Sequence, residues 1–259
     1  GGVMDVYFKI KALHAEGVQI HLHCFEYGRE EAPELNQICT TVNYYKREQS
    51  WLDFSKLTPY IVATRKNDDL LTNLLKDDYP ILFEGLHTCA YLDHAGLKNR
   101  VKAVRMHNVE SDYYSNLGKI ERSMFRKFYF YTESLKLKYF ERILKNANFI
   151  FPISPNDFDQ MHNKYEGVHY LPAFHPNEEV TCLSGQSDFA MYHGNLGVGE
   201  NNQALFDAMT APDGPFTTVF RDDNVIVLKR TGTTEAVDVQ PQRDSCQRLA
   251  DQRAARNGG

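Results

Sequence analysis

The chain has 259 residues, of which 42% are hydrophobic and 24% charged, and its formal net charge is −5 at pH 7. These values are ordinary for a globular protein, and the negative balance gives no basic field that would attract nucleic acid. Five scattered cysteines without a C-x-x-C spacing indicate reduced thiols rather than a disulfide framework or a zinc site. We find no membrane-spanning run and no signal peptide in the sequence, and we expect a cytoplasmic protein, peripheral at most to the inner face of the membrane.

The amino-terminal residues predict a helix followed by a strand. Apolar residues recur at helical spacing from Met4 to His14, Gly17 ends the helix, and residues 18–25 form a strand pattern. Gly1 and Gly2 stand at the start of this helix, as the glycine-rich loop does in a strand–loop–helix phosphate-binding unit, but no strand precedes them in the sequence given. Taken alone, two glycines are more often a flexible terminus or a cloning remnant. We infer that the sequence starts one strand late.

The middle of the chain alternates between strands and helices. In chain order we expect a strand at 60–64, a helix at 68–76, strands at 80–85 and 101–106, a helical region at 111–145 that is broken or double, a strand at 148–153, a helix that begins at Ser154, and a strand at 168–171. This alternation predicts the α/β class, with a mostly parallel, Rossmann-like sheet and helices on both faces.

Residues 188–230 predict a partial second α/β unit. A strand pattern at 189–196 enters a turn at Gly194 and Asn195, and a helix begins at Glu200, as in the first strand–loop–helix of a nucleotide-binding fold. A plain tight turn explains the same residues equally well. Two further runs, 217–220 and 224–228, predict a hairpin. Residues 231–259 are polar and contain no aromatic residue, so we expect a disordered tail.

Polar side chains follow two of the predicted strands. His107, Asn108 and Glu110 come directly after the strand at 101–106, and Glu84 and His87 lie at the end of the strand before it. Ligands bind at the carboxyl ends of strands in open α/β sheets, and histidine with carboxylates can transfer protons there at neutral pH. We therefore expect Glu84, His87, His107 and Glu110 to meet in one pocket.

A structural interpretation competes with this one. Asn108 or Ser111 could simply cap the next helix, with His107 as an ordinary residue at a strand end. Two other patterns are discounted. His21 and His23 alternate on a strand without a third metal ligand, and the basic, aromatic run at 122–138 is interrupted by glutamates. That run could contact an anionic membrane surface, but a solvated amphipathic helix is the stronger interpretation.

Several segments in order resemble the GT-B glycosyltransferases, and in particular the bacterial, retaining, family 4-like group. These segments are 1–20, 79–88 (Tyr-Pro-Ile-Leu-Phe-Glu-Gly-Leu-His-Thr) and 105–114 (Arg-Met-His-Asn-Val-Glu-Ser-Asp-Tyr-Tyr), and 192–201 is similar to the opening of the family's C-terminal domain. The resemblance covers roughly residues 1–205 and implies an acceptor-side domain at 1–180 and a fragment of the donor-side domain at 188–230. The family's donor-binding basic pair and late glutamate pair have no counterpart in 206–259.

The resemblance implies transfer of a hexose from a nucleotide sugar to a glycan or lipid-linked acceptor, with no metal ion and no other cofactor. It assigns catalysis to His107 and Glu110, and substrate binding to Gly1, Gly2, Glu84, His87, Asn108, Gly194, Asn195 and Glu200. Because the donor half is incomplete, we expect this chain to be inactive by itself. The alternative is a non-catalytic α/β remnant that binds sugar or a protein partner. An epimerase or dehydrogenase is disfavoured, since no G-x-G-x-x-G follows a first strand.

Overall fold

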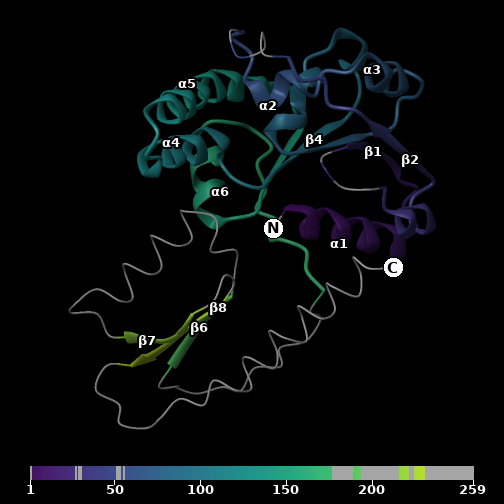
Figure 1. Cartoon of the computed structure of the whole chain (residues 1–259). Helices are drawn as coiled ribbons and strands as arrows, with labels where there is room; N and C mark the ends of the chain where they lie inside the picture. Colours follow the sequence, from purple (N-terminus) through teal and green to yellow (C-terminus); the bar gives the residue numbers. More distant parts are fainter. Residues whose placement is uncertain are drawn as a thin grey trace. The chain divides into compact units, whose positions relative to one another are not determined.

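The computed structural model describes residues 2–26, 28, 31–50, 54, 56–176 and three later strands. The chain divides into two compact units, Gly1–Val180 and Thr181–Gly259. The first unit is mixed α/β, with parallel strands flanked by helices, as the sequence predicts (Figure 1). The roles of acceptor side and donor side remain predictions.

Two parallel sheets form the centre of the first unit. The first pairs β1 (His21–Phe25) with β2 (Thr41–Tyr45). The second has the order β3-β4-β5 and comprises β3 (Ile81–Glu84), β4 (Lys102–Met106) and β5 (Phe149–Pro152). The α-helices are α1 (Gly2–Ala15), α2 (Tyr60–Ala63), α3 (Asp68–Leu74), α4 (Glu110–Ile120), α5 (Met124–Phe140) and α6 (Pro155–His162). Short 3-10 helices are η1 (Pro33–Gln37), η3 (Leu86–Tyr91), η4 (Ala95–Leu97) and η5 (Glu141–Asn146).

Two apolar clusters hold these layers together. The larger one packs the three-stranded sheet against helices and includes Val104, Leu137, Ile150 and Met161, all fully buried. The smaller one includes Tyr45, Leu70, Leu74, Tyr91 and Leu97. Each large apolar side chain that is removed from water contributes about 1.5–3 kcal/mol. None of the helices in the described part of the chain is both long and apolar enough to cross a membrane.

Most expected elements of the first unit are confirmed. The region 111–145 contains two α-helices, α4 and α5, which are separated at Glu121–Ser123. Ser154 caps α6, because its Oγ accepts the hydrogen bond of the Asp157 amide at 3.1 Å. Strand β2 was not predicted.

Two expected strands are wrong. Residues 60–63 form helix α2, which begins after Pro59. The Tyr60 amide donates a 2.6 Å hydrogen bond to Glu133 of α5, so a tertiary contact satisfies the amino end of this helix. The expected strand at 168–171 is reduced to a single bridge between Ile150 and Val168.

The second unit contributes three strands to the described residues. They are β6 (Phe189–His193), β7 (Phe216–Arg221) and β8 (Val225–Arg230), in an antiparallel sheet of order β6-β8-β7. The expected hairpin is confirmed by the pairing of β7 with β8. The expected turn at Gly194 and Asn195, the helix from Glu200 and the tail 231–259 lie outside the described residues, as does Gly1.

Candidate functional site

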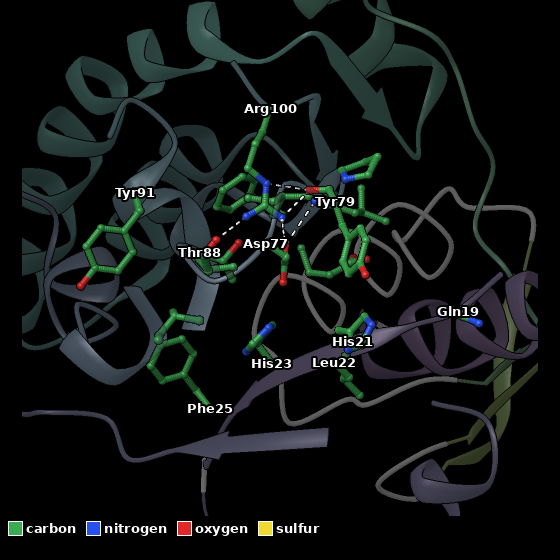
Figure 2. A pocket seen from close by; sticks show the side chains of 17 residues that line it. Gln19, His21, Leu22, His23, Phe25, Asp77, Tyr79, Thr88, Tyr91 and Arg100 are labelled. Carbon is green, nitrogen blue, oxygen red and sulfur yellow. Dashed lines mark hydrogen bonds and ion pairs between the residues drawn. The ribbon is translucent and has the colours of Figure 1, made fainter. Parts of the chain in front are cut away.

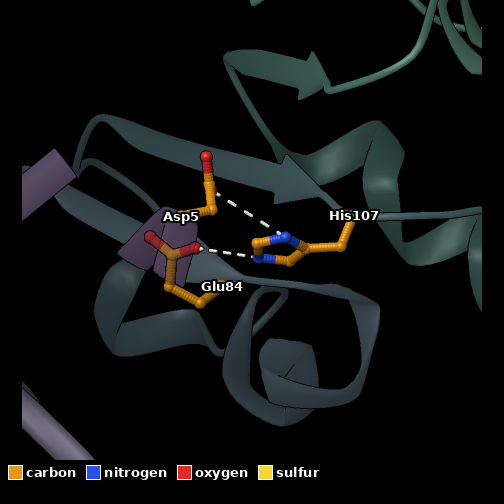
Figure 3. A group of neighbouring side chains, drawn as sticks. All are labelled: Asp5, Glu84 and His107. Atoms are coloured by element: carbon orange, nitrogen blue, oxygen red, sulfur yellow. Dashed lines mark hydrogen bonds and ion pairs between the residues drawn. The ribbon is translucent and has the colours of Figure 1, made fainter. Parts of the chain in front are cut away.

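The carboxyl ends of β3 and β4 meet the amino-terminal half of α1. Glu84 is the last residue of β3, and His107 directly follows β4. His107 Nε2 lies 3.2 Å from Glu84 Oε2, while its Nδ1 lies 3.8 Å from Asp5 Oδ2 on α1 (Figure 3). Gly2 lies against the same ring, since a Cβ built on it would be 3.8 Å from His107 Cε1. The expected contact between Glu84 and His107 is therefore present.

A buried ion pair lies beneath this histidine. Arg105 on β4 has no exposed surface, and its Nε and Nη2 donate to the two oxygens of Asp5 at 3.1 and 2.9 Å. Its remaining N–H groups donate to the carbonyls of Leu171 and Pro172 at 2.6 and 2.9 Å. The Phe174 amide also donates to Asp5, at 2.8 Å. A bidentate pair with these extra bonds fixes α1 and residues 171–174 against the sheet.

Lys9 completes a network of balanced charge. Its ammonium lies 2.6 Å from Glu84 Oε1 and 3.3 Å from Asp5 Oδ2. Two cations, Lys9 and Arg105, thus neutralise two carboxylates. Burial by itself raises the pKa of Asp5, but hydrogen bonds from Arg105 and the Phe174 amide, with the positive charges of Lys9 and Arg105, outweigh it and hold that pKa well below its usual range. Asp5 is therefore ionised at neutral pH.

The His107 ring is positioned by Glu84 on one side only. Its Nδ1 is buried and has no hydrogen-bond partner among the described atoms. The side chain is 17% exposed, so a ligand can still contact the ring. Through the 3.2 Å contact His107 can share a proton with Glu84, the kind of exchange that general acid–base chemistry needs.

A second histidine–carboxylate pair lies beyond the end of β3. His87 Nδ1 is 3.4 Å from Glu110 Oε1. Glu110 is the first residue of α4 and is buried, while the His87 ring covers Gly85 so closely that a Cβ there would lie 2.6 Å from His87 Cε1. Gly85 has φ +88°, which favours glycine. The four expected residues therefore form two pairs, Glu84 with His107 and His87 with Glu110. The pairs lie next to each other, because the His87 ring packs on Gly85, the residue after Glu84.

The capping interpretation of this region is wrong. The residue at the N-cap of α4 is Val109, and no side-chain hydrogen bond caps the helix. Ser111 lies inside α4, where its carbonyl accepts a hydrogen bond from Ser134. Asn108 is half-buried beside His107 and stays a predicted binding residue. The sequence argument missed Asp5 and Lys9. Their one available signal was a charged pair at i and i+4 on a helix that follows two glycines.

Asp5, Glu84 and His107 could in principle hold a metal ion, because their ligand atoms all lie within 4.8 Å of one another. The charges of the surrounding residues do not favour it. Lys9 already occupies the space beside Glu84 at 2.6 Å, and Arg105 neutralises Asp5. A divalent cation would have to displace Lys9 and would lie beside the Arg105 guanidinium. Because its charges are already balanced, the donor set fits an uncharged polar ligand better than a metal ion.

No protein-family model matches the chain. A curated protein of Klebsiella pneumoniae, described as "Uncharacterized 44.6 kDa protein in cps region", is 27% identical over 214 residues. The match covers 79% of this chain and 54% of that protein, so the chain spans about half the length of this relative.

Proposed function

We propose that the first unit is the acceptor side of a glycosyltransferase that moves a hexose from a nucleotide sugar to a glycan or lipid-linked acceptor. The observation that carries this proposal is the contact of His107 with Glu84 at the carboxyl edge of the sheet, beside the start of α1. The relative supports it, since a cps region is a capsule gene region and so hints at carbohydrate biosynthesis.

The chemistry of the site suits a sugar substrate. A carboxylate accepts hydrogen bonds from hydroxyl groups, and a histidine ring can donate to them or accept from them. Both pairs, Glu84 with His107 and His87 with Glu110, contain one carboxylate and one histidine. The N–H groups at the amino end of α1 suit a phosphate oxygen of the donor. In this proposal His107 contacts the transferred sugar, and Glu110 and Asn108 orient the hexose or its acceptor. Transfer proceeds without a metal ion.

Binding can be tested apart from turnover. We expect saturation-transfer NMR on the 259-residue chain to detect UDP-, GDP- or ADP-hexoses, or the acceptor sugars. We expect His107→Ala to abolish the signal. His162→Ala is the matched control, because His162 is exposed on α6 and should leave binding unchanged.

Release of nucleoside diphosphate separates the two functional alternatives. In a longer form of the protein we expect release that requires both an acceptor and His107. Sugar binding without any release would support the non-catalytic alternative instead. Absence of binding by every nucleotide sugar and acceptor sugar would contradict both.

We also propose a peripheral contact between α5 and an anionic membrane surface, which would bring the site to a lipid-linked acceptor. Met124, Phe125 and Phe128 are 76%, 90% and 71% exposed, and the exposed cations Arg122 and Arg126 lie beside them. Exposed aromatic residues with adjacent basic residues are typical of interfacial helices. Co-sedimentation with vesicles that contain phosphatidylglycerol should exceed that with phosphatidylcholine alone, and Phe125→Ser with Phe128→Ser should remove it. Equal binding of the variant to the anionic vesicles would contradict this contact.

A further inference from the structure

The two parallel sheets turn unpaired edges toward one cavity. Strand β1 pairs only with β2, and β3 pairs only with β4, among the strands that the structure describes. Residues of both edges line a cavity with an empty volume of about 980 Å³, which includes the space at its mouth (Figure 2). At the amino-terminal ends of the strands, His21 stacks on Tyr79 with ring centroids 5.4 Å apart.

The main chain of β1 points hydrogen-bonding groups into this cavity. In a parallel strand, the N–H and C=O groups of one residue point to the same neighbouring strand, and those of the next residue point to the strand on the other side. The Ile20 carbonyl accepts from β2, and the Glu26 amide donates to Tyr45, so the even-numbered residues face β2. His21, His23 and Phe25 therefore face the cavity with their main-chain groups. None of these groups has a hydrogen-bond partner within the described ranges.

Strand β3 presents the complementary edge. The Ile81 amide donates to Val101 and the Gly85 amide to Arg105, so the odd-numbered residues face β4. The main-chain groups of Leu82 and Glu84 therefore face the cavity, and they too lack a partner in the described part of the chain. Two such rows on opposite walls match the two edges of one added strand.

Helix α1 indicates how that strand would be connected. Its amino end lies beside His107, and Lys9 contacts Glu84, so α1 begins at the carboxyl end of β3. The chain then runs through α1 into β1, which forms the other wall of the cavity. A strand in the cavity that ran parallel to β1 and β3 would end where α1 starts. It would form a strand–helix–strand unit with α1 as the crossover.

We propose that this cavity is the binding site for one parallel β-strand, supplied by residues joined directly to Gly1. The strand is about as long as the two strands beside it, β1 with 5 residues and β3 with 4 residues. The strand is apolar on both faces, as in covered parallel sheets. It joins the two sheets into one, and its last residue lies next to Glu84, where it forms one wall of the candidate site. This assignment does not depend on sugar transfer.

Hydrogen exchange tests the proposal residue by residue. The chain is extended before Gly1 by the hexapeptide Lys-Ile-Val-Val-Ile-Val, and a control extension of equal length carries proline at its third and fifth positions. We expect at least tenfold slower exchange of the His23, Phe25 and Leu82 amides in the first variant only. Leu22 and Phe83 are the internal controls, because their amides already face β2 and β4.

Two results would overturn the assignment. One is a folded extended chain in which His23 and Leu82 exchange as fast as in the parent. The other is protection of these amides in the parent chain that rises with protein concentration, since the occupant would then be a second copy. Should the extension prevent folding, the free hexapeptide added to the parent chain must slow the same amides, and failure to do so at saturating peptide contradicts the proposal.

Discussion

Replacing Asp5 by asparagine should destabilise the first unit strongly. The substitution keeps the side-chain shape but leaves the Arg105 guanidinium, which has no exposed surface, without its bidentate partner. Removing one member of a buried ion pair costs about 3–5 kcal/mol, out of a typical total stability of about 5–15 kcal/mol. For a unit of this size that corresponds to a fall in Tm of roughly 6–20 °C.

Urea unfolding followed by far-UV circular dichroism measures this loss. Asp159→Asn is the matched control, because Asp159 is exposed on α6 and should change stability by less than about 0.5 kcal/mol. The double variant Asp5→Asn with Arg105→Met should lose about 0.5–3 kcal/mol less than the sum of the single variants, since no uncompensated charge remains. A loss below about 1 kcal/mol in Asp5→Asn, with an unchanged m-value, would refute the reasoning.

Three further predictions concern stability. Glu133→Ala should cost about 1–3 kcal/mol in urea unfolding, because the Tyr60 amide loses its 2.6 Å acceptor, while an unchanged midpoint would show that water replaces it. Gly167→Ala should lower Tm more than Gly17→Ala. Both glycines have positive φ, but only at 167 would the new Cβ meet a backbone carbonyl, so equal losses would exclude that clash. The lowered pKa of Asp5 means that the stability from its carboxylate is complete above its ordinary value of 3.8 and is lost as the pH falls below it. Acidification to pH 3 should therefore destabilise the parent chain more than Asp5→Asn, and equal losses would contradict this.

The sequence predicted the regular elements best where apolar periodicity was long. The strands at 81–84 and 102–106 and the two helices after residue 110 appear as expected. Phe83, Val104 and Leu137 of these elements are buried in the larger apolar cluster. The run Tyr-Ile-Val-Ala at 60–63 was misassigned for the opposite reason. Four residues cannot distinguish a helical period from a strand, and the contact that selects the helix comes from Glu133, 73 positions away.

The candidate site divides in the same way. Glu84 and His107 could be paired in advance, because the carboxyl ends of neighbouring parallel strands share one edge of the sheet. The ion-pair network beneath them could not be predicted from the sequence. Arg105 lies between Val104 and Met106, a position that the strand pattern assigns to the core, and its charge only makes sense with Asp5, which is 100 residues earlier. No local pattern carries information about such a partner.

The Asp5–Arg105 pair also has a kinetic consequence. During synthesis α1 is made before β4, so its buried carboxylate lacks the Arg105 guanidinium until β4 has been made, and the Phe174 amide arrives 169 residues after Asp5. Contacts of such high sequence separation close large loops and slow folding. A nascent chain that ends before residue 105 therefore has Lys9 beside the Asp5 carboxylate but not the bidentate Arg105 partner, so α1 should dock late and leave the edge of the sheet accessible to chaperones until then.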